Sequence, residues 1–156
     1  MKIVGLFFLF LLLAGPCPLA FAHTQIMTET QTLDFGRFAM QDNNAAYGVI
    51  MSPMGVETYD PHILPFSAGR QAIFELTDFA PSTLLGVSIA DTTLMSMVDP
   101  MDYFDLVSFT FNPAAPTTNG AGNVTLNIGA TLRTSGTGVL YTDDTYTGTY
   151  TLVVVY

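Results

Sequence analysis

Two histidines are the side chains best suited to metal chemistry. His23 becomes the first residue if a leader is cut after Ala22, and an N-terminal histidine can bind copper through its amine and ring nitrogen. His62 is the only other histidine and would complete such a site. The alternative is that cleavage simply leaves a histidine on the chain end. We favour this second interpretation, because isolated motif matches readily mislead, and we expect no metal and no cofactor.

Methionines offer a second set of soft ligands. Their thioether sulfurs could bind Cu(I), and five of them lie in two groups, Met51 and Met54, then Met95, Met97 and Met101. Apolar residues surround them, and methionine in such surroundings more often fills gaps in a core. We therefore expect these side chains to pack rather than to bind a metal.

Carboxylates could bind Ca²⁺ through their oxygens. The candidates lie in the second half of the chain, at Asp91, Asp99, Asp102, Asp105, Asp143 and Asp144. No Asp-x-Asp-x-Asp-Gly loop is present, so a solvated acidic face is the simpler interpretation. Asp34, in the stretch LDFG, differs: at the start of a strand its carboxylate could accept backbone N–H bonds, and we assign it a structural role.

Nothing in the sequence indicates an enzyme. There is no Gly-x-Ser-x-Gly, no phosphate-binding glycine loop and no cysteine nucleophile in the mature chain. Two histidines are the only imidazole bases available, which makes nucleophilic catalysis improbable.

The charge of the chain limits its partners. Beyond residue 22 the basic residues are Arg37, Arg70 and Arg133, against thirteen acids, a net charge near −10 (3 − 13). Nucleic acids and anionic membranes are bound largely through lysine and arginine. We therefore exclude nucleic acid as a partner.

The first 22 residues are typical of a signal peptide. Lys2 precedes an apolar run of twelve residues, 3–14, and Ala20-Phe21-Ala22 fits the small-x-small cleavage pattern. The run is short for a membrane span, so we expect export and no stable membrane insertion after cleavage. The single cysteine, Cys17, would leave with the leader. The mature domain would then form no disulfide, and its core alone must stabilise it.

The remaining residues predict an all-β fold. Threonine, valine, tyrosine and phenylalanine dominate, with turn residues between short runs. Strands are expected at 33–40, 47–53, 70–77, 84–90, 105–112, 123–134 and 146–156, with loops at 41–44, 60–61, 99–100, 112–122 and 135–145. About seven strands at this spacing favour an antiparallel β-sandwich. The domains are then a signal peptide (1–22), an N-terminal extension (23–32) and a sandwich (33–156).

Alternation defines the faces of these strands. From Val124 to Leu132 every second residue is apolar, which predicts one buried and one solvated face. Phe74 with Leu76 repeats the alternation, as do Val107, Phe109 and Phe111.

The last strand is unusually apolar for a chain end. Its stretch YTGTYTLVVVY places four large side chains on one face, Tyr150, Leu152, Val154 and Tyr156. Burying four such groups contributes roughly 6–12 kcal/mol, at about 1.5–3 kcal/mol each. That compares with a typical net stability of about 5–15 kcal/mol. We expect this strand to be integral to the sandwich.

An ordered set of motifs resembles a known family. LDFG (33–36), VIMSPMG (49–55), AIFELT (72–77), GVSIA (86–90), TLNIGATLRT (125–134) and YTGTYTLVVVY (146–156) together resemble the bacterial secreted family called domain of unknown function 4402. That family in turn is similar to spore-coat-U and chaperone–usher pilin subunits. The resemblance implies an immunoglobulin-like β-sandwich used as a surface or fimbrial building block, with no catalytic residues.

The resemblance also implies a mode of assembly. In chaperone–usher pilins the domain lacks its last strand, a periplasmic chaperone covers the edge, and a neighbour's N-terminal extension replaces it through an outer-membrane usher. Here the donor would be residues 23–32, in which Ile26 and Met27 are the strongly apolar residues. The acceptor edge would include Tyr150, Leu152, Val154 and Tyr156.

We therefore expect a structural subunit of a bacterial pilus or fimbria, exported through the periplasm to the cell surface. Its partners would be further subunits joined by strand addition. Two alternatives stay open. One is a self-complete secreted coat or adhesion domain that contacts a surface polymer through loops such as 56–69 and 112–122. The other is the copper protein built on His23 and His62.

Overall fold

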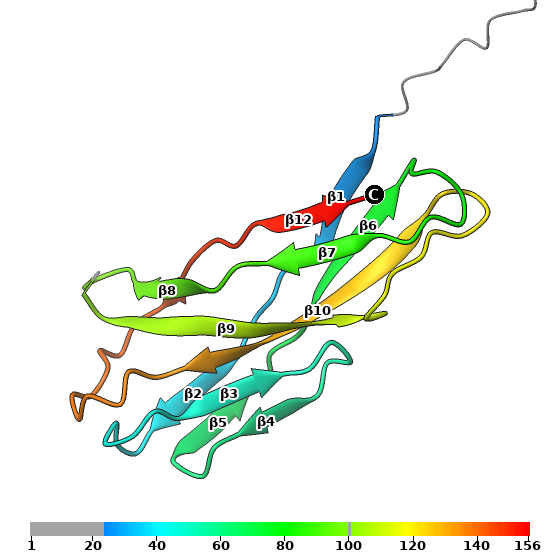
Figure 1. Cartoon of the computed structure of the whole chain (residues 1–156). Helices are drawn as coiled ribbons and strands as arrows, with labels where there is room; N and C mark the ends of the chain where they lie inside the picture. The colour runs from blue at the N-terminus through cyan, green and yellow to red at the C-terminus, as the bar shows by residue number, and fades with distance from the viewer. Residues whose placement is uncertain (1–23, 100) are drawn as a thin grey trace, which may run out of the picture.

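The computed structural model describes residues 24–99 and 101–156, and every regular element among them is a strand (Figure 1). The proposed signal peptide and His23 lie outside the described residues. The strands are β1 (Ile26–Gln31), β2 (Arg37–Met40), β3 (Gly48–Met51), β4 (Glu57–Tyr59), β5 (Ile63–Ser67), β6 (Ala72–Thr77), β7 (Gly86–Ile89), β8 (Thr92–Ser96), β9 (Tyr103–Asn112), β10 (Val124–Arg133), β11 (Tyr146–Thr147) and β12 (Leu152–Val155).

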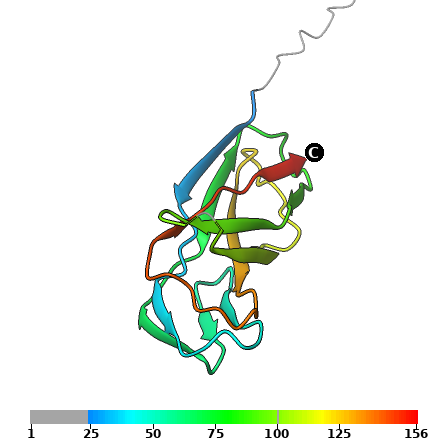
Figure 2. The same ribbon diagram turned by 90° about the vertical axis from the view of Figure 1, so that its left-hand side faces the viewer.

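The strands form an antiparallel sandwich, which confirms the predicted fold class. The main sheet has the order β1-β6-β10-β9-β8-β11, and β3 joins it beside β10 and carries β4 on its other edge. Two ribbons of two strands each, β7-β12 and β2-β5, complete the structure. Figure 1 places β7-β12 beside one half of the long sheet and β2-β5 at the opposite end, and Figure 2 shows the same arrangement from the side.

Strand β10 is the centre of the main sheet. One edge pairs with β9, while the other pairs first with β6, over 124–128, and then with β3, over 130–133. Its apolar alternation holds throughout: Leu126, Ile128, Ala130 and Leu132 are buried. The strand therefore supplies side chains to both halves of the molecule.

Strand β9 departs from simple alternation. The register between β9 and β10 shifts between Gly129 and Thr131, opposite Ser108, whose φ is +55°. Such a bulge reverses which residues face inward. Phe104 and Leu106 are buried before it, whereas Phe109 packs toward the core after it. The prediction that Val107 shares a face with Phe109 and Phe111 is wrong for this reason.

The final segment is two strands rather than one. Residues 146–147 form β11, which pairs with β8, and 152–155 form β12, which pairs with β7. Between them Gly148 passes so close to Thr93 that a Cβ would lie 2.3 Å from the Thr93 carbonyl oxygen. Only glycine allows this approach, and there the chain crosses from one sheet to the other. The expected continuous strand over 146–156 is therefore corrected.

The described residues contain twelve strands where about seven were expected. The four missed strands are β1, β4, β5 and β8. Strands β1, β4 and β5 lie at sheet edges: β1 has five exposed residues, β4 has three residues in all, and β5 has one buried residue and contains Pro65. Strand β8 lies between β9 and β11 and is mostly half-buried, but its sequence, TTLMS, shows little apolar alternation. The loops expected at 41–44, 60–61 and 135–145 are confirmed as connections between strands, and so is 112–122 except for Asn112, the last residue of β9. The loop expected at 99–100 includes Pro100, which lies outside the described residues.

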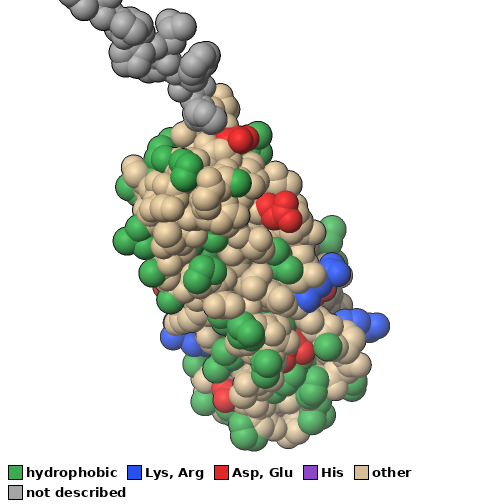
Figure 3. All heavy atoms as spheres, turned by 90° about the vertical axis from the view of Figure 1, so that its right-hand side faces the viewer, with side chains coloured by type: hydrophobic (Ala, Val, Ile, Leu, Met, Phe, Trp, Pro, Cys, Tyr) green, Lys and Arg blue, Asp and Glu red, His purple; other side chains and the backbone are tan. Residues whose placement is uncertain are grey.

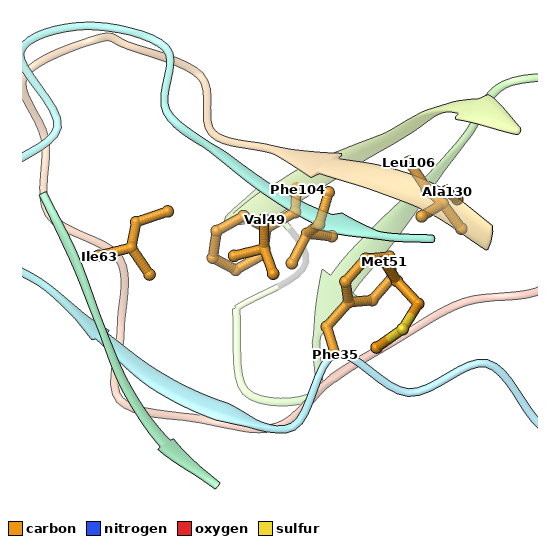
Figure 4. Packing of buried hydrophobic residues seen from close by; sticks show 8 residues of the cluster. Phe35, Val49, Met51, Ile63, Phe104, Leu106 and Ala130 are labelled. Carbon is orange, nitrogen blue, oxygen red and sulfur yellow. The ribbon is translucent and has the colours of Figure 1, made fainter. Parts of the chain in front are cut away.

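Two separate groups of buried side chains form the core. The first core, seen in Figure 4, consists of Phe35, Val49, Met51, Ile63, Phe104, Leu106, Ala130 and Leu132. The second core consists of Ala72, Leu76, Phe79, Leu85, Leu126 and Ile128. Strand β10 contributes to both, so it joins the two halves into one domain.

Candidate functional site

Strand β12 is paired on one edge. It forms an antiparallel ladder with β7 over all four residues, and no other described strand pairs with it. Val153 and Val155 are 48% and 65% exposed, while Leu152 and Val154 pack against the second core. The second edge of this apolar strand therefore has no ladder partner among the described strands, and unpaired edges are where a further strand can add.

The layer that contains β12 is thin. Strands β7 and β12 together cover the second core, yet neither contributes a fully buried residue. A two-stranded ribbon is marginal on its own and depends on what it packs against. A further strand beside β12 would widen this layer.

The predicted acceptor residues fall into two groups. Tyr150, Leu152 and Val154 all pack against the second core, so the predicted shared face is confirmed for these three. Tyr156 is 65% exposed, although its ring meets Phe79 edge-on with centroids 5.2 Å apart. Its side chain therefore covers the end of the core rather than entering it.

The predicted donor segment belongs largely to strand β1. Residues 26–31 pair with β6 of the same chain, with an irregularity between Glu29 and Gln31. Five of these six residues are exposed, including Ile26 and Met27. Like β12, β1 has one paired edge among the described strands. The segment predicted as an extension thus contributes a weakly buried strand to its own sheet.

Tyr150 links the region of β1 to the segment that leads into β12. Its hydroxyl donates to Glu29 Oε1 at 3.4 Å, and its ring contacts Phe74 and Phe109 at centroid distances of 6.4 and 5.7 Å. Burial, with the Glu29 carboxylate nearby, raises the pKa of Tyr150 above its usual value of 10. The sequence predicted the tyrosine, but Glu29 shows no signal that would identify it as its partner.

His62 is held by a carboxylate and an aromatic ring. Its Nδ1 lies 2.7 Å from Asp42 Oδ2, and its ring stacks on Tyr47 with centroids 4.5 Å apart. Tyr47 in turn donates its hydroxyl to Asp42 Oδ1 at 2.8 Å. These contacts join the loop before β3 to the turn before β5. His23, the proposed copper partner, lies outside the described residues.

The candidate calcium ligands serve the loops around the first core. Ser96 and the backbone N–H of Val98 donate to Asp144, and the hydroxyl of Tyr146 donates to Asp102 at 2.7 Å. The Ser96 hydrogen bond, followed by backbone N–H groups, lowers the pKa of Asp144. Over residues 24–99 and 101–156, no group of three or more histidine, cysteine or acidic side chains is arranged to hold a metal.

Asp34 has the role that the sequence predicts for it. Its carboxylate accepts the backbone N–H of Gly36 at 2.8 Å, and its backbone pairs with Arg70. The methionine prediction holds for Met51, which is fully buried, but is wrong for Met54, Met95, Met97 and Met101. These four lie at strand ends and turns, where no core gap is available to fill, and their exposure ranges from 48% to 86%.

Apolar side chains also stand at the surface elsewhere. Figure 3 shows one face of the molecule, on which hydrophobic side chains recur along its length between few charged groups. No helix that could cross a membrane occurs in the described part of the chain.

These features define a class of protein: an antiparallel β-sandwich whose second layer ends in an open, apolar strand. Comparison with family models adds the family. The chain belongs to the family described as Domain of unknown function (DUF4402), whose model matches residues 26–156, from the first residue of β1 to the end of the chain. Searches of curated proteins and of solved structures returned no match.

Proposed function

We propose that the protein is a structural subunit of a bacterial surface fibre, built by strand addition at the open edge of β12. The observation that carries this proposal is the one-sided pairing of β12 in a layer of two strands. An added strand gains affinity from backbone hydrogen bonds and register from alternate side chains. The exposed Val153 and Val155 would then be covered by a neighbour.

The second open edge supports an extended assembly. Strand β1 carries the candidate donor residues Ile26 and Met27 and pairs with β6 alone among the described strands. If the β1 region of one copy meets β12 of the next, the two contacting surfaces differ. Such head-to-tail contacts continue without closing unless a rotation forms a ring. The resemblance to pilins suggests that a periplasmic chaperone and an outer-membrane usher assist this assembly.

The alternative is a self-complete coat or adhesion domain. One specific observation favours it: residues 26–31 already pair with β6 of the same chain. In that case the edge of β12 would stay uncovered in the mature protein, and the chain would be recovered as a monomer.

Cysteine pairing between copies distinguishes the two. The only cysteine, Cys17, lies in the proposed leader, so single cysteines can be introduced into a mature chain that has none. We expect Val153→Cys and Ile26→Cys proteins, mixed under mild oxidation, to form a disulfide-linked heterodimer. The matched control pairs Val153→Cys with Thr58→Cys, at the exposed middle residue of strand β4.

The amount of cross-linking distinguishes strand addition from a self-complete domain. Cross-linking of Val153→Cys to Ile26→Cys well above the control supports strand addition, as does an SDS-resistant ladder of the native chain isolated from the periplasm. Equal, low cross-linking in both mixtures, together with a monomer from the periplasm, would overturn the fibre and favour the self-complete domain.

A further inference from the structure

A hollow lies on the outer face of the sheet formed by β4, β3 and β10. Cross-strand register places Thr58, Ile50 and Thr131 in one row. In the next row on the same face, Gly48 pairs with Arg133 on one side. On the other side its C=O accepts from the backbone N–H of Asp60 at 3.0 Å, and its N–H donates to the Asp60 carboxylate at 2.6 Å. Because Gly48 has no side chain, the space between Asp60 and Arg133 is empty of protein atoms and forms a hollow of about 220 Å³.

The backbone does not require glycine at position 48. A Cβ there would meet its nearest neighbours, Thr131 Cγ2 and Asp60 Oδ2, at 3.5 and 3.7 Å, which is ordinary contact. Its φ is not in the left-handed region. Gly129, in the adjacent strand, differs: its Cβ would lie 2.2 Å from a backbone oxygen. Glycine inside a strand weakens it and often marks a site of close approach by a ligand.

Polar groups of opposite charge stand on the two sides of the hollow. One carboxylate oxygen of Asp60, Oδ2, accepts a hydrogen bond from the backbone N–H of Gly48 at 2.6 Å. A carboxylate has several further acceptor positions. Arg133 Nη2 lies 3.8 Å from Asp105, too far for a hydrogen bond. Its guanidinium group therefore keeps donors for a ligand, although its charge is paired with that of Asp105.

The rest of the lining suits a ring with one apolar face. Ile50, 47% exposed, forms an apolar floor. Tyr47 and Tyr59 border the hollow, and their side chains pack toward the first core. Tyr47 is held in place by its stack on His62 and its hydrogen bond to Asp42. Thr58 and Thr131 bring hydroxyl groups to the lining. A hollow of about 220 Å³ has room for a single small ring.

We propose that this hollow at Gly48 binds a neutral sugar ring. Vicinal hydroxyls of a pyranose can donate to Asp60 and accept from Arg133, while the C–H face of the ring packs on Ile50. With Arg133 paired to Asp105, the Asp60 carboxylate disfavours an anionic ligand. The site does not depend on strand addition, because it lies on β3, β4 and β10 and not on β12.

The test titrates the 15N-labelled mature chain with methyl glycosides of glucose, galactose and mannose, and with the free sugars. We expect one or more to shift the amide signals of residues 46–50, 58–60 and 131–133. A Kd on the order of millimolar is expected, because a single ring offers few atoms. A preference for methyl glycosides would indicate the end of a glycan chain as the source, and a preference for the free sugars a monosaccharide.

Two variants address the geometry directly. Gly48→Val fills the hollow and is expected to weaken binding at least about tenfold, with Gly48→Ala intermediate, since steric exclusion opposes the ligand. Arg133→Gln removes the charge but keeps a polar side chain at this position in β10. It is expected to weaken sugar binding by about tenfold, because the charged hydrogen bonds are lost. Gly86→Ala is the matched control, because a Cβ at this second strand glycine also meets only ordinary contacts, at 3.7 Å.

The proposal is overturned if none of the sugars shifts these signals. It is also overturned if Gly48→Val and Arg133→Gln, each with a native spectrum, bind like the parent, or if glucuronate or acetate binds more tightly than the neutral sugars. None of these outcomes bears on cross-linking through Val153, so failure of this site and failure of the fibre can be told apart.

Discussion

The two cores of the molecule are enclosed to different degrees. Around the first core, β3, β5, β9 and β10 each contribute at least one buried side chain. Around the second core, buried strand residues come from β6 and β10, while the covering strands β7 and β12 have only half-buried inner faces. One half of the sandwich is therefore closed by its own chain, and the other is covered by a ribbon with an open edge.

This difference separates stability from assembly. A closed core needs nothing further, whereas a thin cover leaves apolar surface that a neighbouring strand can bury. Natural sheets usually protect their edges with charges, prolines or bulges. Strand β12, LVVV, has none of these, which is why the second core is the half that we associate with a partner.

The largest expected effect comes from a pair of cavity-forming variants, one in each core, which tests how differently the two cores are enclosed. Leu106 and Leu126 are both buried, one in each core. Replacing either with alanine is expected to cost about 2–5 kcal/mol, and the cost falls where neighbours can relax into the cavity. We expect Leu106→Ala to lie near the top of that range and Leu126→Ala lower, as measured by urea unfolding.

The control for this pair is the dependence of unfolding on urea. Equal slopes for both variants would show that they unfold from similarly compact native states. A larger loss for Leu126→Ala than for Leu106→Ala would contradict the distinction between the two cores.

A second, smaller test concerns β12 itself. Leu152 packs on the second core while the neighbouring Val153 points outward and is 48% exposed. We expect Leu152→Ala to lose roughly 1–2 kcal/mol, less than a full core deletion because the side chain is half-buried. Val153→Ala should stay within about 0.5 kcal/mol, as surface changes usually do. Similar losses of stability in the two variants, measured on a monomer, would mean that the inward and outward faces of β12 are wrongly assigned.

Sequence reasoning succeeded where side-chain alternation continues without interruption. Strand β10 was predicted almost to the residue, because ten residues alternate in a strand that is paired on both edges. The face formed by Tyr150, Leu152 and Val154 was predicted for the same reason. In these elements local pattern and tertiary packing agree.

Prediction from the sequence failed where backbone geometry interrupts the alternation of side chains. The bulge at Ser108 exchanges the inward and outward residues of β9, and serine at positive φ is not a common signal. Gly148 breaks the last segment into two strands because of a contact with Thr93, a residue far away in the sequence. The hollow at Gly48 was missed as well, because Asp60 and Arg133 come together only through the register of three strands.

The smallest expected effect is on pH dependence, and it too differs between the two halves. Hydrogen bonds hold the pKa of two carboxyl groups below the ordinary value of 3.8. For Asp42 the donors are first the backbone N–H of Asn44 and then the hydroxyl of Tyr47, and for Asp144 the first is the hydroxyl of Ser96. Both groups anchor loops beside the first core. As the pH falls below about 3.8, the unfolded chain takes up protons before the folded one does, so this stabilisation is fully present above that pH and is lost below it.

We therefore expect acid to loosen the first-core loops before the ribbon that covers the second core. Hydrogen-exchange protection factors, corrected for intrinsic rates, should fall around 41–47 and 142–146 as the pH drops below about 3.8, while those of β7 and β12 change less. In Asp144→Asn, which cannot ionise, the pH dependence around 142–146 should be reduced while that around 41–47 remains. Earlier loss of protection in β7 and β12 would show that the open edge, rather than the carboxylate-anchored loops, is the acid-sensitive part of the domain.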